Sequence, residues 1–191
     1  MSIFEFVFAL YSVIGSLAIA HLLAGIAGLI RNRQRVKVSI VHALWMWGAF
    51  AITIGNWASQ WSLHAMDAWP GWSVLVKVAT VVVTYLACYL VTPDIPSEGE
   101  INLKDFHTRE RVGYISAFGG IGLISILSNL TFGAANYFDE WLRDSALSLV
   151  ALCLMLLALL VRASWAQIIA AVGTAALATY FLVVASSIGT G

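Results

Sequence analysis

Long apolar runs separated by short polar breaks dominate the pattern of hydrophobic and polar positions along this chain. Each run has close to the length, about 20 residues, that an α-helix needs to cross the hydrocarbon core of a bilayer. The pattern predicts an all-α integral membrane protein, in which one domain forms a bundle of about six transmembrane helices. The predicted spans cover residues 6–30, 38–63, 73–91, 112–132, 145–161 and 165–187 of the single domain 1–191.

Composition supports the same class of protein. Of the 191 residues, 61% are hydrophobic and 10% are charged, whereas soluble domains contain about 25% charged residues. Six crossings with their loops use the whole length, so no separate soluble domain is expected. The first run is not preceded by basic residues and is longer than the apolar region of a signal peptide, so we expect it to remain as a helix.

The distribution of basic residues predicts the orientation. Eight of the ten Lys and Arg residues fall in three alternate loops, residues 31–37, 92–111 and 162–165. Basic loops stay in the cytoplasm, so both termini are predicted on the outer side of a plasma membrane, the inner membrane in a bacterium. Anionic lipid head groups also attract such loops, and nucleic-acid binding is not expected. The eight residues are Arg31, Arg33, Arg35, Lys37, Lys104, Arg109, Arg111 and Arg162.

The cytoplasmic loop 92–111 is the longest polar segment. It is predicted to carry a short surface helix that rests Ile101, Leu103 and Phe106 on the membrane interface. His107 lies in the same loop near several acidic residues, where a metal site is one interpretation. The loop has no tight ligand spacing such as H-x-x-x-H, so a solvated loop is the favoured interpretation.

Small residues recur at helical spacing in two of the predicted spans, which lets another helix backbone approach closely. The favoured interpretation is packing within the bundle. The alternative is an interface with a second copy of the chain or with another membrane subunit. One stripe consists of Ser12, Ser16, Ala20, Ala24 and Gly28, and the other of Ala166, Ala170, Thr174 and Ala178.

Polar residues in the hydrocarbon region are costly, so each needs a structural partner or a functional reason. The second and third predicted spans carry polar stripes, which must face protein or water. With the predicted orientation, one group of these residues falls in the outer half of the membrane. It forms the candidate solute-binding cluster, which consists of Asn56, Gln60, His64 and Lys77, with Glu5 from the first span.

Two histidines in the spans, His21 and His42, invite a haem hypothesis, because imidazoles from neighbouring helices can ligate a haem in a membrane bundle. Their depths argue against it. At 1.5 Å per residue, His21 lies about 13 Å from the cytoplasmic end of its helix and His42 about 6 Å. Packing and hydrogen bonding are the favoured roles, and no cofactor is expected.

The sequence contains no nucleotide-binding loop, no zinc-protease helix motif and no nucleophile elbow, so an enzyme is not the favoured class. The first hypothesis is a transporter or channel for a small polar or anionic solute, which binds at the outer polar cluster. The second is a structural or regulatory membrane subunit, in which these polar groups only hold helices together. The third is a membrane redox protein that uses haem or quinone.

Overall fold

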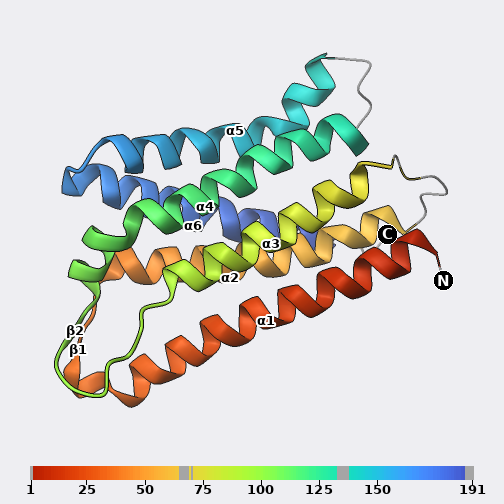
Figure 1. Cartoon of the computed structure of the whole chain (residues 1–191). Coiled ribbons are helices and arrows are strands. Elements are labelled where there is room, and N and C mark those ends of the chain that lie inside the picture. Colours follow the sequence, from red (N-terminus) through yellow and green to blue (C-terminus); the bar gives the residue numbers. More distant parts are fainter. Residues whose placement is uncertain (1, 65–68, 70, 133–137, 188–191) are drawn as a thin grey trace.

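The computed structural model is an all-helical bundle, and it describes residues 2–64, 69, 71–132 and 138–187 (Figure 1). Short 3-10 helices, Arg33–Arg35 and Gln60–Leu63, follow the first and second long helices. Two strands of two residues each, β1 (Val36–Lys37) and β2 (Ile101–Asn102), pair in parallel. The six long helices of the described residues are α1 (Ile3–Arg31), α2 (Ile40–Ser59), α3 (Ser73–Val91), α4 (Leu103–Phe132), α5 (Phe138–Leu160) and α6 (Ser164–Ser187).

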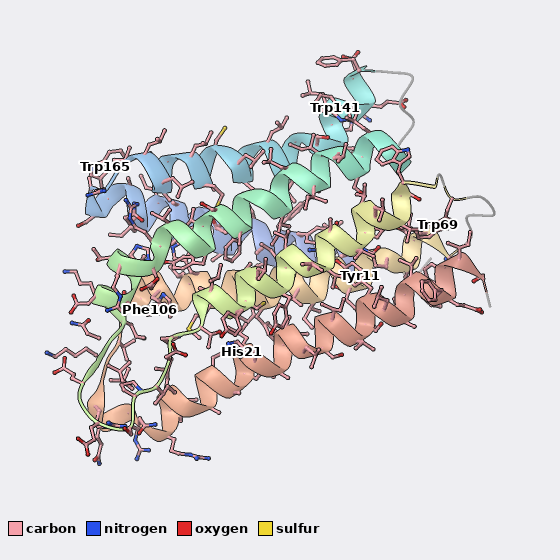
Figure 2. The ribbon with its side chains drawn as sticks, in the orientation of Figure 1. Tyr11, His21, Trp69, Phe106, Trp141 and Trp165 are labelled. Atoms are coloured by element: carbon pink, nitrogen blue, oxygen red, sulfur yellow. The ribbon has the colours of Figure 1, made fainter. Side chains whose placement is uncertain are left out.

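The long helices run up and down between two ends of the bundle (Figure 1). We call the end that carries β1 and β2 the sheet end, and the end where α1 begins and α2 ends the far end. Trp69 and Trp141 lie at the far end and Trp165 lies at the sheet end (Figure 2). Tryptophans near both ends of a bundle are typical of proteins whose helices cross a membrane.

Five of the helices, α1, α3, α4, α5 and α6, are long and apolar enough to cross a membrane. Large apolar side chains on their outer faces are exposed, including Leu17 (57%), Leu123 (62%) and Val183 (60%). In water such a surface would be unfavourable, whereas lipid tails cover it without cost. The fold is therefore that of a multi-pass membrane protein.

Helix α2 is not one of these five apolar helices, although its 20 residues are enough to span a bilayer. Its His, Asn, Trp and Gly residues lower its mean hydropathy. It contacts α1, α3, α4 and α6, and it packs most extensively against α6. The largest side chain in the core comes from it: Trp45 is fully buried against the rings of Tyr114 and Phe118, at centroid distances of 5.7 and 5.3 Å. A central helix faces protein rather than lipid, so it tolerates polar residues.

Most boundaries agree with the predicted spans, but α4 and α5 begin earlier. Helix α4 begins at Leu103 rather than near residue 112, and α5 begins at Phe138 rather than near residue 145. Both added segments are polar. The hydropathy pattern marks only the part of a helix that is apolar, whereas the backbone hydrogen bonds continue outside it. Asp139 and Glu140 also favour a helix start at α5, since carboxylates stabilise the first turn.

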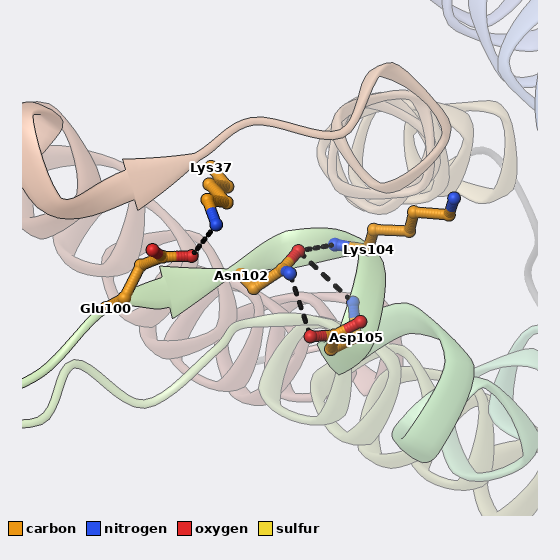
Figure 3. A network of polar contacts seen from close by, with 5 residues as sticks. All are labelled: Lys37, Glu100, Asn102, Lys104 and Asp105. Carbon is orange, nitrogen blue, oxygen red and sulfur yellow. Dashed lines mark hydrogen bonds and ion pairs between the residues drawn. The ribbon is translucent and has the colours of Figure 1, made fainter.

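Helix α4 begins at the small parallel sheet (Figure 3). The Asn102 side chain caps it, because its Oδ1 accepts from the backbone N–H groups of Lys104 (3.1 Å) and Asp105 (3.4 Å). Lys37 of β1 forms an ion pair with Glu100 beside β2, with 2.7 Å between Nζ and Oε1. The hydrogen bond to this carboxylate raises the pKa of the exposed Lys37 ammonium.

Arg35 fixes the connection between α3 and β2 to the loop after α1. Its guanidinium donates to the backbone carbonyls of Pro96 (3.3 Å), Ser97 (3.1 Å) and Gly99 (3.2 Å) and to Asn32 Oδ1 (2.7 Å). This loop was predicted from its charge alone to be a cytoplasmic basic segment. The arginines of this loop differ in their contacts, and the role of Arg35 is structural.

The prediction that a surface helix rests its apolar side chains on the membrane interface is wrong. Ile101 and Leu103 are buried in the protein, with 5% and 4% of their surface exposed, because β2 pairs with β1 and α4 starts directly after it. The solvated environment predicted for His107 is also wrong, since His107 is buried with 6% of its surface exposed.

The two stripes of small residues have different surroundings. Ala166, Ala170, Thr174 and Ala178 of α6 are buried, as predicted for packing within the bundle. On α1, by contrast, the middle of the predicted packing face does not pack within the bundle, because Ser16, Ala20 and Ala24 are exposed. The buried face of α1 lies beside the stripe and consists of Val7, Tyr11, Gly15, Ala18 and Leu22.

At Gly55, α2 lies so close to α6 that there is no room for a side chain. A Cβ atom added there would lie 2.7 Å from Phe181 Cδ1 and 3.4 Å from the Leu182 Cα. We expect Gly55→Ala to lower the free energy of unfolding by about 1–3 kcal/mol, since overpacking must displace the Phe181 ring. Thermal or denaturant unfolding in detergent measures the change. Gly15→Ala is the matched control, because a Cβ there meets nothing within 4 Å, and equal losses in both variants would refute the close approach.

Candidate functional site

A polar cavity of about 340 Å³ lies near the far end of the bundle. Asn56 and Gln60 from α2 and the turn after it line the cavity, together with Lys77 from α3. These are three of the five residues predicted as a solute-binding cluster. The remaining lining comes mainly from hydroxyl, amide and carboxylate side chains on four helices: Ser59, Ser62, Thr80, Ser125, Ser128, Asn129 and Asp144. The cavity reaches the surface of the bundle, since Ser62 and Asp144 are exposed.

Lys77 is the cation of this cavity and is buried, with 9% of its surface exposed. Its ammonium donates to the Ser128 hydroxyl of α4, at 3.3 Å. Lysine is one of the most costly residues to place within the hydrocarbon region of a membrane. A polar cavity that admits water or a polar solute reduces this cost.

Two amides of the cavity, those of Asn56 and Asn129, join neighbouring helices, whereas that of Gln60 bonds within its own segment. Asn56 Nδ2 donates to Thr84 Oγ1 of α3 at 3.4 Å, and Gln60 Nε2 donates to the Asn56 carbonyl at 2.8 Å. On the opposite wall, Asn129 of α4 donates to the Asp144 carbonyl of α5 at 3.0 Å. Several of these polar residues therefore have a structural role as well as a place in the lining.

The other two candidates, Glu5 and His64, lie outside the cavity lining. Glu5 completes a capping box at the start of α1, in which its backbone N–H donates to Ser2 Oγ at 3.1 Å and its carboxylate accepts from Ser2 N at 2.8 Å. His64 is exposed and stacks on Trp61, with 5.1 Å between ring centroids. Ser2 followed three residues later by Glu5 is a capping signal that the sequence already contained.

Asp144 is the charged lining residue that sequence reasoning missed. It lies in α5, just before the predicted start of the fifth span, and the sequence pattern assigns an acidic residue at that position to a loop. Because α5 begins at Phe138, Asp144 occupies the second turn of a helix and is part of the cavity lining. The lining thus includes a basic residue from α3 and an exposed acidic residue from α5.

A second cavity of about 230 Å³ shares several lining residues with the first, including Asn56, Ser125 and Asp144. It continues toward the middle of the bundle, where Phe118 and Met155 line it. Its inner part is more apolar than the first cavity. Farther toward the sheet end, fully buried Trp45 and Tyr114 fill the interior.

A buried polar network closes the sheet end behind these aromatic rings. His107 Nε2 lies 3.2 Å from Gln167 Oε1, which only accepts, so Nε2 donates and Nδ1 accepts from the Tyr114 hydroxyl. The Gln167 amide donates to the carbonyls of Ala158 (2.9 Å) and Val161 (2.6 Å). The Arg111 guanidinium also donates to the Ala158 carbonyl. The network satisfies the last carbonyls of α5 and joins α4, α5 and α6.

The two histidines considered for haem have different neighbours. His21 of α1 stacks on Tyr89 of α3, with 4.6 Å between centroids. His42 of α2 is buried and makes edge contacts with Phe106 (5.0 Å) and Tyr114 (6.0 Å) of α4. Neither histidine lines either of the two cavities described above. In the described part of the chain, no three His, Cys, Asp or Glu side chains are grouped as they would be around a metal ion.

Comparison with known proteins adds no family to these observations. No protein-family model matches the sequence, and neither the curated proteins nor the solved structures contain a significant match. The site's chemistry therefore rests on its own geometry.

The polar cavity is expected to contain water. In protein with Cys153→Ala, which removes the exposed native thiol, Asn56→Cys and Ser125→Cys should react with a charged methanethiosulfonate reagent, because both positions line the cavity. The reaction is followed by mass spectrometry on protein in lipid nanodiscs. Val150→Cys is the control, since it places a thiol on an exposed apolar face of α5. No reaction at positions 56 and 125, or equal reaction at 150, would show that the cavity is dry.

Proposed function

We propose that this protein is a small membrane transporter that binds a small polar solute in the cavity at the far end of the bundle. The observation that carries the proposal is the convergence of Asn56, Gln60 and Lys77 on one cavity that reaches the surface. Amides orient a bound solute through hydrogen bonds, and the ammonium attracts an anionic group. The cavity volume of about 340 Å³ suits a molecule of a few heavy atoms.

The closed sheet end favours a transporter over an open channel. Trp45 and Tyr114 fill the interior, and the Arg111, His107 and Gln167 network lies behind them. A cavity open at one end and closed at the other is the arrangement that one state of an alternating-access transporter requires. Passage of the solute would need the packing around Trp45 to rearrange.

The charges of the lining suggest which solutes fit. A simple anion would pair with Lys77 but would be repelled by the Asp144 carboxylate. A zwitterion that carries both a carboxylate and an ammonium group would satisfy both side chains. We therefore favour a small zwitterionic solute, of the size of an amino acid, over an anion alone.

The proposed topology places all six helices across a plasma membrane, with both termini and the cavity on the outer side. Helix α2 is included because it extends along the neighbouring helices between the two ends of the bundle (Figure 1). The loops that contain most of the basic residues lie at or near the sheet end, so the positive-inside rule supports a cytoplasmic sheet end.

A second function, that of a structural or regulatory membrane subunit, is supported by the exposed small residues of α1. Ser16, Ala20 and Ala24 present a surface of low bulk to the outside, where a helix of another protein or of a second copy packs closely. In that case the polar groups of the cavity would serve only to join helices. A dry cavity and an absence of solute uptake would favour this second function.

Uptake by proteoliposomes distinguishes the solute classes. Radiolabelled alanine and lactate have nearly the same size, but alanine carries an ammonium group where lactate carries a hydroxyl group. We expect uptake of alanine and less of lactate. Lys77→Ala should reduce uptake of alanine about tenfold or more, because a hydrogen bond to a charged group contributes about 1.5–3 kcal/mol. Asp144→Asn should reduce uptake of alanine but not that of lactate.

The controls for this assay keep the charge change and move it away from the cavity. Lys104→Ala and Asp139→Asn remove charges from α4 and α5 at positions that do not line it. Uptake that stays normal in Lys77→Ala, or falls equally in Asp139→Asn and Asp144→Asn, would refute the proposed solute site.

The proposed topology has its own test in intact cells. Against the Cys153→Ala background, Ser62→Cys should react with a membrane-impermeant maleimide added outside, because Ser62 is exposed at the far end. Gln34→Cys, which is exposed at the sheet end, should react only after the cells are permeabilised. The opposite result would place the sheet end outside and invert the topology.

A further inference from the structure

An apolar groove of about 530 Å³ lies between α1 and α2 at the sheet end, far from the polar cavity. The last turns of α1, including Leu23 and Ile26, line one side, and α2 lines the other side through Ala43 and Phe50. The loop between these helices and Leu103, the first residue of α4, contribute the rest. Apart from Arg33, its lining is apolar: Leu23, Ile26, Leu29, Ile30, Val36, Val38, Ala43, Met46, Trp47, Phe50 and Leu103.

The groove faces the outside of the bundle. Leu23 (48%), Ile30 (62%) and Trp47 (44%) are all exposed. From Leu23 to Ile30 the groove follows α1 for about 10 Å, at 1.5 Å per residue. Because α1 is a membrane-capable helix, this part of its surface is at the depth of lipid tails. The molecules that reach it are those of the bilayer.

Arg33 gives the groove a charged end. It is the one charged residue of the lining, and it is exposed. Among the described residues its guanidinium makes no hydrogen bond or ion pair. Arg35, two residues later, instead donates hydrogen bonds to three carbonyls of the loop before β2. Arg33 is therefore available to bind an anion from outside the chain. Arginine suits a phosphate because its planar donors form paired hydrogen bonds.

We propose that this groove binds an anionic glycerophospholipid, with an acyl chain along the apolar lining and the phosphate of the head group at Arg33. An apolar groove with one basic residue at the membrane surface matches a lipid in both shape and charge. Further positive charge, from Arg31 two residues earlier, adds to the attraction for an anionic rather than a zwitterionic head group. The site does not depend on the proposed solute transport or on which side of the membrane the sheet end faces.

Native mass spectrometry of the full chain in detergent tests the proposal, with dioleoylphosphatidylglycerol and dioleoylphosphatidylcholine as the two probes. We expect phosphatidylglycerol to be retained preferentially. Arg33→Gln should reduce that preference about fivefold, the factor that one basic residue near an anionic surface supplies. Arg33→Lys should keep most of it. Equal retention of the two lipids by the unmodified chain would overturn the proposal.

Two controls separate a site from general attraction to a basic loop. Arg31→Gln removes the same charge from a neighbouring exposed residue that does not line the groove, so it should have a smaller effect than Arg33→Gln. Ala43→Phe should fill the groove and weaken retention of both lipids, whereas Ala27→Phe, on an exposed part of α1 outside the lining, should not. Equal effects within either pair would show that no specific lipid site exists.

Discussion

Polar groups in the hydrocarbon region of a membrane must be covered by protein or by water, and the rest of this structure depends on how that constraint is met. The chain places α2, which carries His42, Asn56 and several tryptophans, at the centre of the bundle, where four other helices contact it. The five apolar helices can face lipid on their outer sides. Because α2 is covered in this way, Asn56 and Gln60 come to line an internal cavity rather than an outer surface.

The two ends of the bundle meet the same constraint differently. At the far end, the polar side chains border an open cavity, and several of them also make hydrogen bonds between helices. At the sheet end, one set of buried polar groups is paired closely: Gln167 and Arg111 both donate to the last carbonyls of α5, and Gln167 also accepts from His107. In the proposed transporter, the far end would admit the solute and the sheet end would stay closed.

The basic loop after α1 shows how residues of one kind divide their tasks. Arg35 is held by backbone carbonyls and fixes the loop before β2, while Lys37 pairs with Glu100 beside the same strand (Figure 3). Arg33 is left to face outward at an apolar groove. In the sequence these residues form a single cluster of positive charge, whereas in the structure Arg33 and Arg35 lie in a 3-10 turn and Lys37 lies in β1, so their side chains have different neighbours.

The sequence by itself determined the class of the fold, because runs of about 20 apolar residues have few other stable forms. It also placed Asn56, Gln60 and Lys77 together, since helical spacing and alternating span direction bring them to one level. It did not reveal Asp144, His107 or the outward face of the α1 stripe. Those depend on where a helix begins in polar sequence and on which side of it meets a neighbour. Side-chain packing between distant segments decides both, and local hydropathy contains no information about it.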